Sequence, residues 1–515
     1  MVCQLDGFYQ KYWETVGVGD DILLNENGSI VSINSTLITL KVDEPKSALS
    51  SGLSIIDRSN NNISVTIANT PLNIRYLRST ISSSHDADKN HHNHLFFAEL
   101  PFSGPNENTE NVPPSKIVDM LHSSSSLELP FRRLLHDIAA KEGRPVLCII
   151  TDMFFGWATD VANSVGTLNF TFTTCGAYGT LATASTWLHL PHRHTNSHDF
   201  VLPGFPERCR FHRSQLNNEV RDADGTDLWS KFMQPQLSLS LKSHGWFCNT
   251  VEEIEPLGLE SLRSFLQLPV WAVGCCPSLN KHSSRKDLGI PFKTCLEWLN
   301  EQRPESVVYV SFGSQNTIGS AQMMELAKGL EKSGKPFIWV VRPPLGFDIK
   351  EDFQSEWLPE SFEKRMAETK QGLIVKNWAP QMDILSHKST RLFLSHCGWN
   401  SVIESLSQGV PIVAWPLAAE QAYNSKMLVE EMGVCLELTR GSESCVKDED
   451  VKRVIELAMN GDDKGREIRM KVSIIKEQIK NATREEGNLK GSSVKALDDF
   501  LSFLQTQISV GRSSD

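Results

Sequence analysis

The sequence predicts an α/β protein with parallel sheets, because short apolar strands alternate with helical segments through both halves of the chain. The run PVLCIITD at 145–152 is apolar over most of its length, as expected of a strand buried on both faces. A helical segment at 157–166 follows and ends at Gly166, and LNFTFTT at 168–174 is the next strand. These three segments form one β-α-β unit.

The second half of the chain repeats this alternation. SVVYVSFGS at 306–314 predicts a strand that ends in a glycine-serine turn, and the helix after it carries an apolar stripe and ends at Gly334. Further apolar strands are predicted within 336–342, 373–380, 390–396 and 411–417, with helices between most of them. Amphipathic helices are expected around 451–458 and 494–504.

At 515 residues the chain is too long for one ordinary domain, and two domains are expected. Residues 1–62 are expected to form an atypical, irregular segment, and the regular alternation of strands and helices begins near Ile63. The expected division then continues as an N-terminal domain at 63–274, a polar linker at 275–292, a C-terminal domain at 293–482 and a C-terminal helix at 483–505.

Charge and composition exclude several classes of protein. A formal net charge of −11 argues against a general nucleic-acid binder, which needs a basic face. No apolar run approaches the ~20 residues that cross a bilayer, and the N-terminus lacks a secretion signal, so a cytoplasmic protein is expected. The 11 cysteines are scattered and are expected to be reduced, structural thiols. A metal site at His91, His92 and His94 is the weaker alternative to a polar loop.

Polar residues follow the carboxyl end of the strand TRLFLS, where ligands bind in parallel sheets. The strand ends at His396, a turn follows at Gly398, and a helix is expected to start around Asn400 and Ser401. A helix start after a glycine turn offers free N–H groups and a positive dipole end, which suits a phosphate. The alternative is that Ser401 and Glu404 form a capping box and that His396 is only a turn residue.

Neighbouring strand ends favour a ligand at the same edge. Trp378 ends one strand and offers a ring to stack on a base, while Gln381 can reach a sugar hydroxyl. Glu420 and Gln421 follow the next strand and add polar groups that suit hydroxyls. The turn at Ser314 forms a second corner that faces phosphate. Aromatic, phosphate-binding and hydroxyl-binding partners on successive strand ends predict a nucleotide-sugar site.

The segment WAPQMDILSHKSTRLFLSHCGWNSVIESLSQGVPIVAWPLAAEQ, residues 378–421, closely resembles the signature box of plant family 1 UDP-dependent glycosyltransferases. Supporting similarity covers most of the chain from about Ile63 and includes TIANTPLNIRYLRS, CIITDMFFGW, CLEWLNEQRPESVVYVSFGS and FIWVVRPP. The resemblance implies a GT-B fold, in which two Rossmann-like domains face each other across a cleft. It also implies that the C-terminal helix crosses back onto the N-terminal domain.

The resemblance further implies roles for particular residues of the C-terminal domain. Trp378 matches the ring that stacks on uracil, and Ala379 matches a residue that offers backbone contacts to the base. The other matches are Gln381 and Glu404 for the ribose, His396, Asn400, Ser401 and Ser314 for the diphosphate, and Trp399, Glu420 and Gln421 around the hexose. Gln421, the last residue of this segment, matches a glutamine of family members that prefer UDP-glucose. UDP-glucose is therefore the expected donor, with no metal and no other cofactor.

Transfer to a hydroxyl needs a general base, and here the match to the family is incomplete. The family's base is a His in a Gly-His turn after the first strand, and a buried Asp, matched here by Asp152, orients it. A helix N-cap is the alternative role for Asp152. The chain has no histidine before His85, and the expected turn falls at LKVDEP, 40–45, where Asp43 or Glu44 is a weakly supported substitute. Residues 1 to about 50 are interpreted as a foreign or misassembled N-terminus that removes the central parallel strand.

Two functions therefore stand. The first is an active UDP-glucosyltransferase that acts on a small hydrophobic acceptor such as a flavonoid, another phenolic or a terpenoid. The second is a catalytically impaired UDP-sugar-binding homologue. The hypothesis of a nicotinamide oxidoreductase has less support, because no G-x-G-x-x-G follows a strand. The loops at 83–115 and 176–215 are expected to contact the acceptor. Five residues are candidates for an apolar acceptor pocket or for the core: Phe154, Phe155, Tyr178, Trp187 and Leu188.

Overall fold

The computed structural model describes residues 63–82, 95–104, 107, 112, 116–274, 292–314, 316–348, 351–441, 445–460, 463–486 and 489–512, and strands at 22–24, 30–33 and 37–42. The sites suggested at His91, His92, His94, Asp43 and Glu44, and the expected linker up to residue 291, lie outside these residues. Within them, every helix is too short or too polar to span a bilayer.

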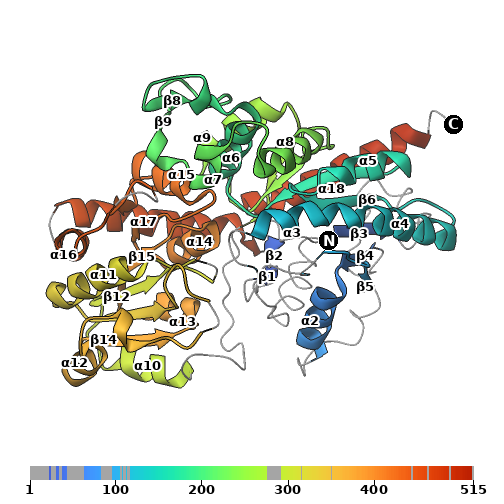
Figure 1. The fold of residues 1–515 in the computed structure, drawn as a ribbon. Helices are drawn as coiled ribbons and strands as arrows, with labels where there is room; N and C mark the ends of the chain where they lie inside the picture. The colour runs from blue at the N-terminus through green and yellow to red at the C-terminus, as the bar shows by residue number, and fades with distance from the viewer. Residues whose placement is uncertain are drawn as a thin grey trace.

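Two lobes, each built on its own sheet, make up the molecule (Figure 1). The N-terminal lobe holds a seven-stranded sheet in the order β11-β10-β7-β6-β3-β4-β5. Its strands are β3 (Leu37–Val42), β4 (Ile63–Asn69), β5 (Leu95–Glu99), β6 (Cys148–Asp152), β7 (Leu168–Thr173), β10 (Trp246–Cys248) and β11 (Val270–Ala272). Two hairpins lie outside this sheet, β1 (Ile22–Leu24) with β2 (Ile30–Ile33) and β8 (Asp199–Val201) with β9 (Arg210–His212).

Helices separate most of these strands. They are α2 (Pro71–Ser82), α3 (Ile117–Ser123), α4 (Glu128–Glu142), α5 (Trp157–Ser164), α6 (Ala177–His189), α7 (Asn218–Asp222), α8 (Leu228–Ser240) and α9 (Pro256–Leu266), with short 3-10 turns at Ser124–Leu127, Pro191–Arg193 and Arg213–Gln215. The β6-α5-β7 unit confirms the β-α-β unit predicted at 145–174. The loop predicted at 176–215 is wrong over its first half, because α6 occupies most of it with ten buried residues.

The C-terminal lobe holds a six-stranded sheet in the order β14-β13-β12-β15-β16-β17, and all of its pairs are parallel. Its strands are β12 (Val307–Ser311), β13 (Phe337–Val341), β14 (Gly372–Lys376), β15 (Thr390–Ser395), β16 (Ile412–Ala414) and β17 (Cys435–Glu437). β12 and β13 are buried along their whole length, which explains their continuous apolar sequences.

The helices of this lobe cover the two faces of the sheet (Figure 1). They are α10 (Phe292–Asn300), α11 (Ser320–Ser333), α12 (Phe362–Thr369), α13 (Gln381–Ser386), α14 (Trp399–Gln408), α15 (Gln421–Lys426), α16 (Asp448–Met459) and α17 (Asp463–Ala482), with a 3-10 turn at Ser355–Trp357 and a π-helical turn at Met427–Glu431. A hairpin of β18 (Glu485–Glu486) and β19 (Leu489–Lys490) then leads to α18 (Ser492–Arg512). Gly334, at φ 62°, ends α11 as the sequence predicts.

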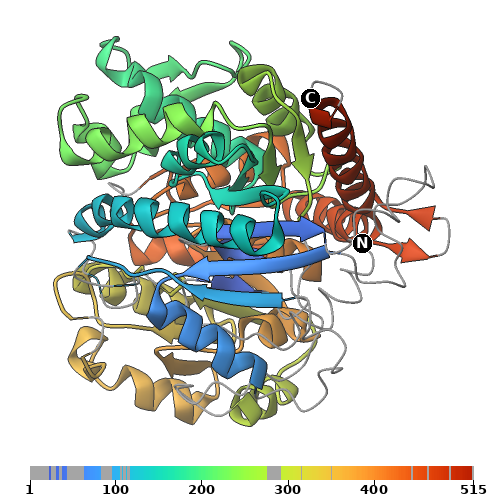
Figure 2. The same cartoon turned by 90° about the vertical axis from the view of Figure 1, so that its right-hand side faces the viewer.

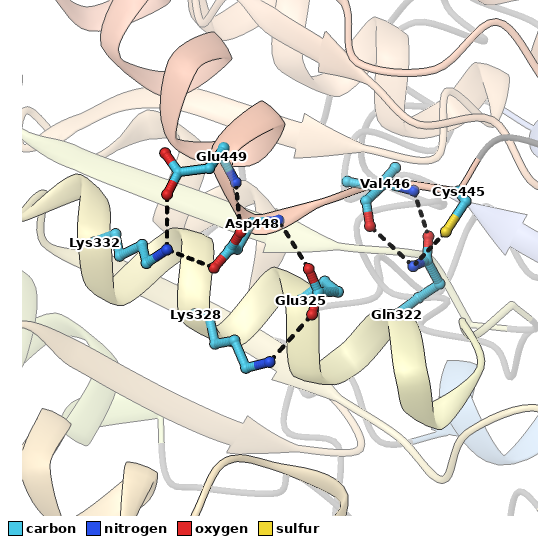
Figure 3. A network of polar contacts seen from close by, with 8 residues as sticks. All are labelled: Gln322, Glu325, Lys328, Lys332, Cys445, Val446, Asp448 and Glu449. Atoms are coloured by element: carbon cyan, nitrogen blue, oxygen red, sulfur yellow. Dashed lines mark hydrogen bonds and ion pairs between the residues drawn. The ribbon is translucent and has the colours of Figure 1, made fainter.

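Polar contacts fix α11 against α16 on the outside of this lobe (Figure 3). Lys332 Nζ lies 2.7 Å from both Asp448 Oδ2 and Glu449 Oε1. Glu325 Oε2 accepts a hydrogen bond of 3.1 Å from the Asp448 backbone N–H, at the start of α16. The two helices approach closely at Gly329, where an added Cβ would lie 2.7 Å from the Asp448 carbonyl oxygen. This pairing closes the apolar core on that side of the sheet.

The centre of the N-terminal sheet differs from the expectation. β3 fills the position between β6 and β4, so the sheet has no missing strand, but β3 runs antiparallel to both neighbours. Leu37 pairs with Thr151 near the carboxyl end of β6, whereas Val42 pairs with Ile63 at the start of β4. The turn expected at 40–45 is therefore strand as far as Val42, and β3 ends at the edge of the sheet opposite Asp152.

The last helix joins the two lobes. α18 leaves the C-terminal lobe and lies along the N-terminal lobe, where Figures 1 and 2 show it in red beside the strands of that sheet. Trp271 Nε1 of β11 donates a hydrogen bond of 2.8 Å to Asp499 Oδ2. The Phe500 ring, 4% exposed, lies 5.0 Å from the Phe170 ring and 4.7 Å from the Phe247 ring, centroid to centroid. These aromatic contacts make α18 part of the N-terminal core.

Candidate active site

The residues predicted to bind a donor all follow carboxyl ends of strands in the C-terminal sheet. Because the sheet is parallel throughout, the segments after β12, β14, β15 and β16 emerge at one edge. Ser314 follows β12, Trp378 to Gln381 follow β14, His396 follows β15, and Glu420 and Gln421 follow β16. The structure thus brings the four groups of sequence-predicted residues to the same edge.

His396 lies between two glycine turns at this edge. Its imidazole is buried, and a Cβ added to Gly313 or Gly398 would lie 2.7 Å or 2.5 Å from its Nε2 atom. Neither turn therefore accommodates a side chain while His396 keeps this position. Burial, together with the positive charge of Arg342, lowers the pKa of His396 to about 4. The ring is neutral at physiological pH and offers one N–H donor.

Gln381 connects three side chains, one from β12 and two from α14. Its Oε1 atom accepts a hydrogen bond of 3.2 Å from the Tyr309 hydroxyl. Its Nε2 atom donates to Ser401 Oγ at 3.0 Å and to Glu404 Oε2 at 2.6 Å. The capping box considered for Ser401 and Glu404 is wrong, because the N-cap of α14 is Gly398, which has no side chain to form one. Burial raises the pKa of the Glu404 carboxyl to about 7, and the bond from Gln381 opposes the rise.

The N-terminus of α14 also faces this edge. The helix begins at Trp399, slightly earlier than predicted, so the backbone N–H groups of Trp399, Asn400 and Ser401 have no partner within the helix. Together they carry the positive end of the helix dipole. The Trp399 ring itself is 3% exposed and lies in the interface between the lobes.

Trp378 and Ala379 face different surroundings. Trp378 is partly exposed and follows Asn377, whose φ of 69° turns the chain out of β14. Ala379 is buried in an apolar cluster. The ring contact expected of Trp378 and the backbone contact expected of Ala379 stay predictions.

The first residues of α15 are held by their own loop. Gln421 Oε1 accepts hydrogen bonds of 2.9 Å from the backbone N–H groups of Leu417 and Ala418, which fixes the orientation of its amide. Glu420 Oε1 accepts a bond of 3.2 Å from Asn424 Nδ2. Burial raises the pKa of the Glu420 carboxyl.

Asp152 stands at the carboxyl end of β6 and is 3% exposed. Its Oδ1 atom accepts a hydrogen bond of 2.8 Å from the Phe154 N–H, and burial raises the pKa of its carboxyl to about 7. The N-cap role considered for Asp152 is wrong, because α5 begins at Trp157 with Gly156 as its N-cap. The Asp152 carboxylate therefore stabilises the turn after β6 and does not cap α5.

Sequence reasoning missed Cys175, which lies between carboxyl groups of the two lobes. Burial raises the pKa of its thiol well above the usual value, and the negative charges of Glu420 and Asp152 raise it further. Cys175 therefore lies near both the predicted donor-sugar residue Glu420 and the predicted catalytic residue Asp152. No local motif signals this position, since the three residues come from distant parts of the chain.

Glu255 is a second residue that the sequence did not reveal. Its carboxyl oxygens accept hydrogen bonds of 3.1 Å from the backbone N–H groups of Ala177 and Tyr178 at the start of α6. Burial raises the pKa of Glu255 to about 7. Of the aromatic and apolar residues considered for the acceptor, Phe155, Tyr178 and Trp187 are core, while Phe154 and Leu188 are partly buried.

Comparisons with known proteins agree with this architecture. A solved structure from Glycyrrhiza uralensis, UGT73P12 complexed with glycyrrhetinic acid 3-O-monoglucuronide, is 28% identical with a TM-score of 0.72, and the match covers 87% of this chain and 92% of that one. A UGT transferase from Siraitia grosvenorii in complex with UDP is 27% identical with a TM-score of 0.70, over 86% of this chain and 93% of that one. The fold is thus of the GT-B type, with two Rossmann-like domains.

Sequence comparisons define the family. The model of the UDP-glucoronosyl and UDP-glucosyl transferase family matches residues 284–479. UDP-glycosyltransferase 92A1 of Arabidopsis thaliana is 40% identical over 449 residues, which are 86% of this chain and 90% of that protein. Crocetin glucosyltransferase 3 of Crocus sativus is 42% identical over 78% of this chain and 85% of its own length. The chain belongs to the plant family 1 UDP-dependent glycosyltransferases.

Proposed function

We propose that this glycosyltransferase moves glucose from UDP-glucose to a hydroxyl of a small hydrophobic acceptor, with inversion. The observation that carries the proposal is the Gln381, Ser401 and Glu404 network beside the N-terminus of α14. It combines oxygen acceptors suited to ribose hydroxyls with backbone donors suited to a diphosphate. The relatives support the donor, since anthocyanin, flavonoid and scopoletin glucosyltransferases are 32–34% identical to this chain.

The proposed donor contacts are those that the family resemblance implies for each matched residue. Trp378 stacks on the uracil and Ala379 contacts its edge through the backbone. Gln381 and Glu404 bind the ribose, while His396, Asn400, Ser401 and Ser314 bind the diphosphate. Around the hexose lie Trp399, Glu420 and Gln421. The side-chain oxygen Oε1 of Gln421 accepts hydrogen bonds from two backbone N–H groups. Its Nε2 group is therefore the end that donates to a sugar hydroxyl. No metal or other cofactor enters this proposal.

For transfer itself, we propose that the Asp152 carboxylate promotes removal of the acceptor's proton. Its burial and raised pKa suit proton transfer near neutral pH. The acceptor class, a flavonoid, another phenolic or a terpenoid, is proposed from the relatives, which include a crocetin glucosyltransferase and an abscisate glucosyltransferase.

A second function, UDP-sugar binding without efficient catalysis, is favoured by the direction of β3. Because β3 is antiparallel, its last residue Val42 lies about 17 Å along the strand from Leu37, which is beside the end of β6. A turn after β3 therefore starts at the edge opposite Asp152. The Gly-His turn expected from the family resemblance would need the other edge.

Titration with UDP and a transfer assay separate these functions. Both functions require that the folded chain binds UDP, so no detectable heat of UDP binding would contradict both. Glucoside formation from UDP-glucose and a panel of phenolic acceptors supports the first function. UDP binding with transfer at the background rate supports the second.

The raised pKa of Glu404 gives the donor site a testable pH dependence. A carboxylate accepts stronger hydrogen bonds from ribose hydroxyls than a neutral carboxyl group does, so affinity rises as Glu404 ionises through about pH 7. Uridine is the suitable probe because it carries no phosphate that titrates in this range. We expect its affinity to increase about fivefold between pH 6 and pH 8, from the difference between neutral and charged hydrogen bonds.

Calorimetric titration of uridine at several pH values measures this change. Glu404→Gln is the matched variant, because it keeps the size of the side chain and removes the titrating group. Its uridine affinity should be independent of pH. An equal pH dependence in both proteins would show that Glu404 does not contact the ribose.

A further inference from the structure

Asn249 of the N-terminal lobe contacts the helix that we propose to bind the donor diphosphate. It follows β10 directly and is 3% exposed. Its backbone N–H donates a bond of 3.2 Å to the Thr173 carbonyl, which ties it to the end of β7. From this position it reaches the first two residues of α14 in the other lobe.

Two contacts cross between the lobes here. The Asn249 carbonyl accepts a hydrogen bond of 2.6 Å from Trp399 Nε1. Its side-chain Nδ2 donates to Asn400 Oδ1 at 3.4 Å and also to the Thr174 carbonyl oxygen at 3.2 Å. Asn249 therefore contacts both residues that open α14.

The Thr174 carbonyl determines which way both amides face. A carbonyl oxygen only accepts, so the end of Asn249 that faces Thr174 and Asn400 must be its NH2 group. Asn400 must then present its oxygen to Asn249. The NH2 end of Asn400 is left as the end that donates to an anionic ligand.

Close packing holds this arrangement in place. A Cβ added to Gly274 would lie 2.3 Å from Asn249 Oδ1 and 2.6 Å from the Asn249 carbonyl carbon. A Cβ added to Gly176 would lie 2.6 Å from the Trp399 ring. Glycine at 274 leaves room for Asn249 within the N-terminal lobe, and glycine at 176 lets the Trp399 ring of the other lobe approach.

We propose that Asn249 is a positioning residue for the donor, which orients the Asn400 amide toward the diphosphate and couples the acceptor lobe to donor binding. The inference rests on the proposed function, because it takes Asn400 as a diphosphate ligand. The inference adds one requirement for donor binding. Asn249 of the N-terminal lobe must orient the Asn400 amide, which the C-terminal lobe cannot do alone.

Asn249→Asp tests this proposal in the full chain. The new carboxylate has nearly the shape of the amide but only accepts, so Asn400 turns its NH2 group toward it and its oxygen toward the phosphates. We expect the affinity for UDP to fall about tenfold, as for the loss of one hydrogen bond to a charged group, while the affinity for uridine stays the same. The KM for UDP-glucose should rise with it, and the KM for the acceptor should not.

Asn169→Asp is the matched control, because Asn169 is a buried asparagine of the same lobe that bonds Thr151 and Thr159. It should change the melting temperature without changing the ratio of UDP to uridine affinity. If Asn249→Asp does not fold, Asn249→Ala takes its place. In an Asn400→Ala background, Asn249→Ala should have no further effect on that ratio.

The possible results separate this inference from the proposed function. A wild-type chain that does not bind UDP overturns both. A wild-type chain that binds UDP, with the same ratio of UDP to uridine affinity in the folded Asn249 variant, overturns only the positioning role. A lower ratio that persists equally in the Asn400→Ala background also overturns it, because the effect then bypasses Asn400.

Discussion

Asp152→Asn is expected to lower kcat for glucosyl transfer by about two to four orders of magnitude, the range for removing a positioned acid-base group or its partner. Asparagine keeps the hydrogen bond from Phe154 N–H but neither accepts a proton nor stabilises a positive charge. The Kd of UDP should not change, because Asp152 is not among the residues proposed to bind the donor. Initial rates with UDP-glucose and one phenolic acceptor, together with calorimetry, measure both quantities.

Asp160→Asn is the control for this change. Asp160 is exposed on α5, eight positions later in the same lobe, so its amide variant should keep full activity. In the wild-type chain, kcat/KM should rise as pH increases through about 7, because only the ionised Asp152 carboxyl promotes proton removal. Equal kcat values for wild type and Asp152→Asn would exclude Asp152 from the reaction.

Phe500→Ala is expected to reduce the free energy of unfolding by about 3–5 kcal/mol, the range for removing a buried aromatic ring. The ring fills a space bounded by Phe170, Phe247 and Trp271, and α18 closes over it. Urea unfolding followed by circular dichroism and tryptophan fluorescence measures the change.

Ile474→Ala provides the comparison. Ile474 lies on α17 and is 54% exposed, so its truncation should change stability by no more than about 0.5 kcal/mol. A loss below about 1 kcal/mol for Phe500→Ala would show that α18 does not contribute to the N-terminal core.

Local patterns predicted most of the C-terminal lobe. Most of its strands are short apolar runs bounded by glycine or polar residues, and the central ones are buried in a parallel sheet, so composition and spacing were sufficient. The edge where Trp378, His396 and Glu420 gather follows from the parallel arrangement alone.

Contacts between distant residues could not be predicted in this way. Gln381 bonds Glu404 across 23 positions, Asn249 reaches Asn400 across 151, and no periodicity encodes either pair. The sequence also failed to predict β3, because residues 1–62 were expected to be irregular and a turn was expected at 40–45. An apolar segment such as LITLKV can pair in either direction, so its residues do not determine that the strand is antiparallel.

The contact between Trp271 and Asp499 has a consequence for the synthesis of this protein. The two residues are 228 positions apart, and the whole C-terminal lobe is translated between them. Phe170, Phe247 and Trp271 therefore stay uncovered by α18 until that lobe has been made. The lobe made first is therefore the lobe completed last, and a stop codon shortly before α18 would release a chain with an open aromatic core that favours aggregation.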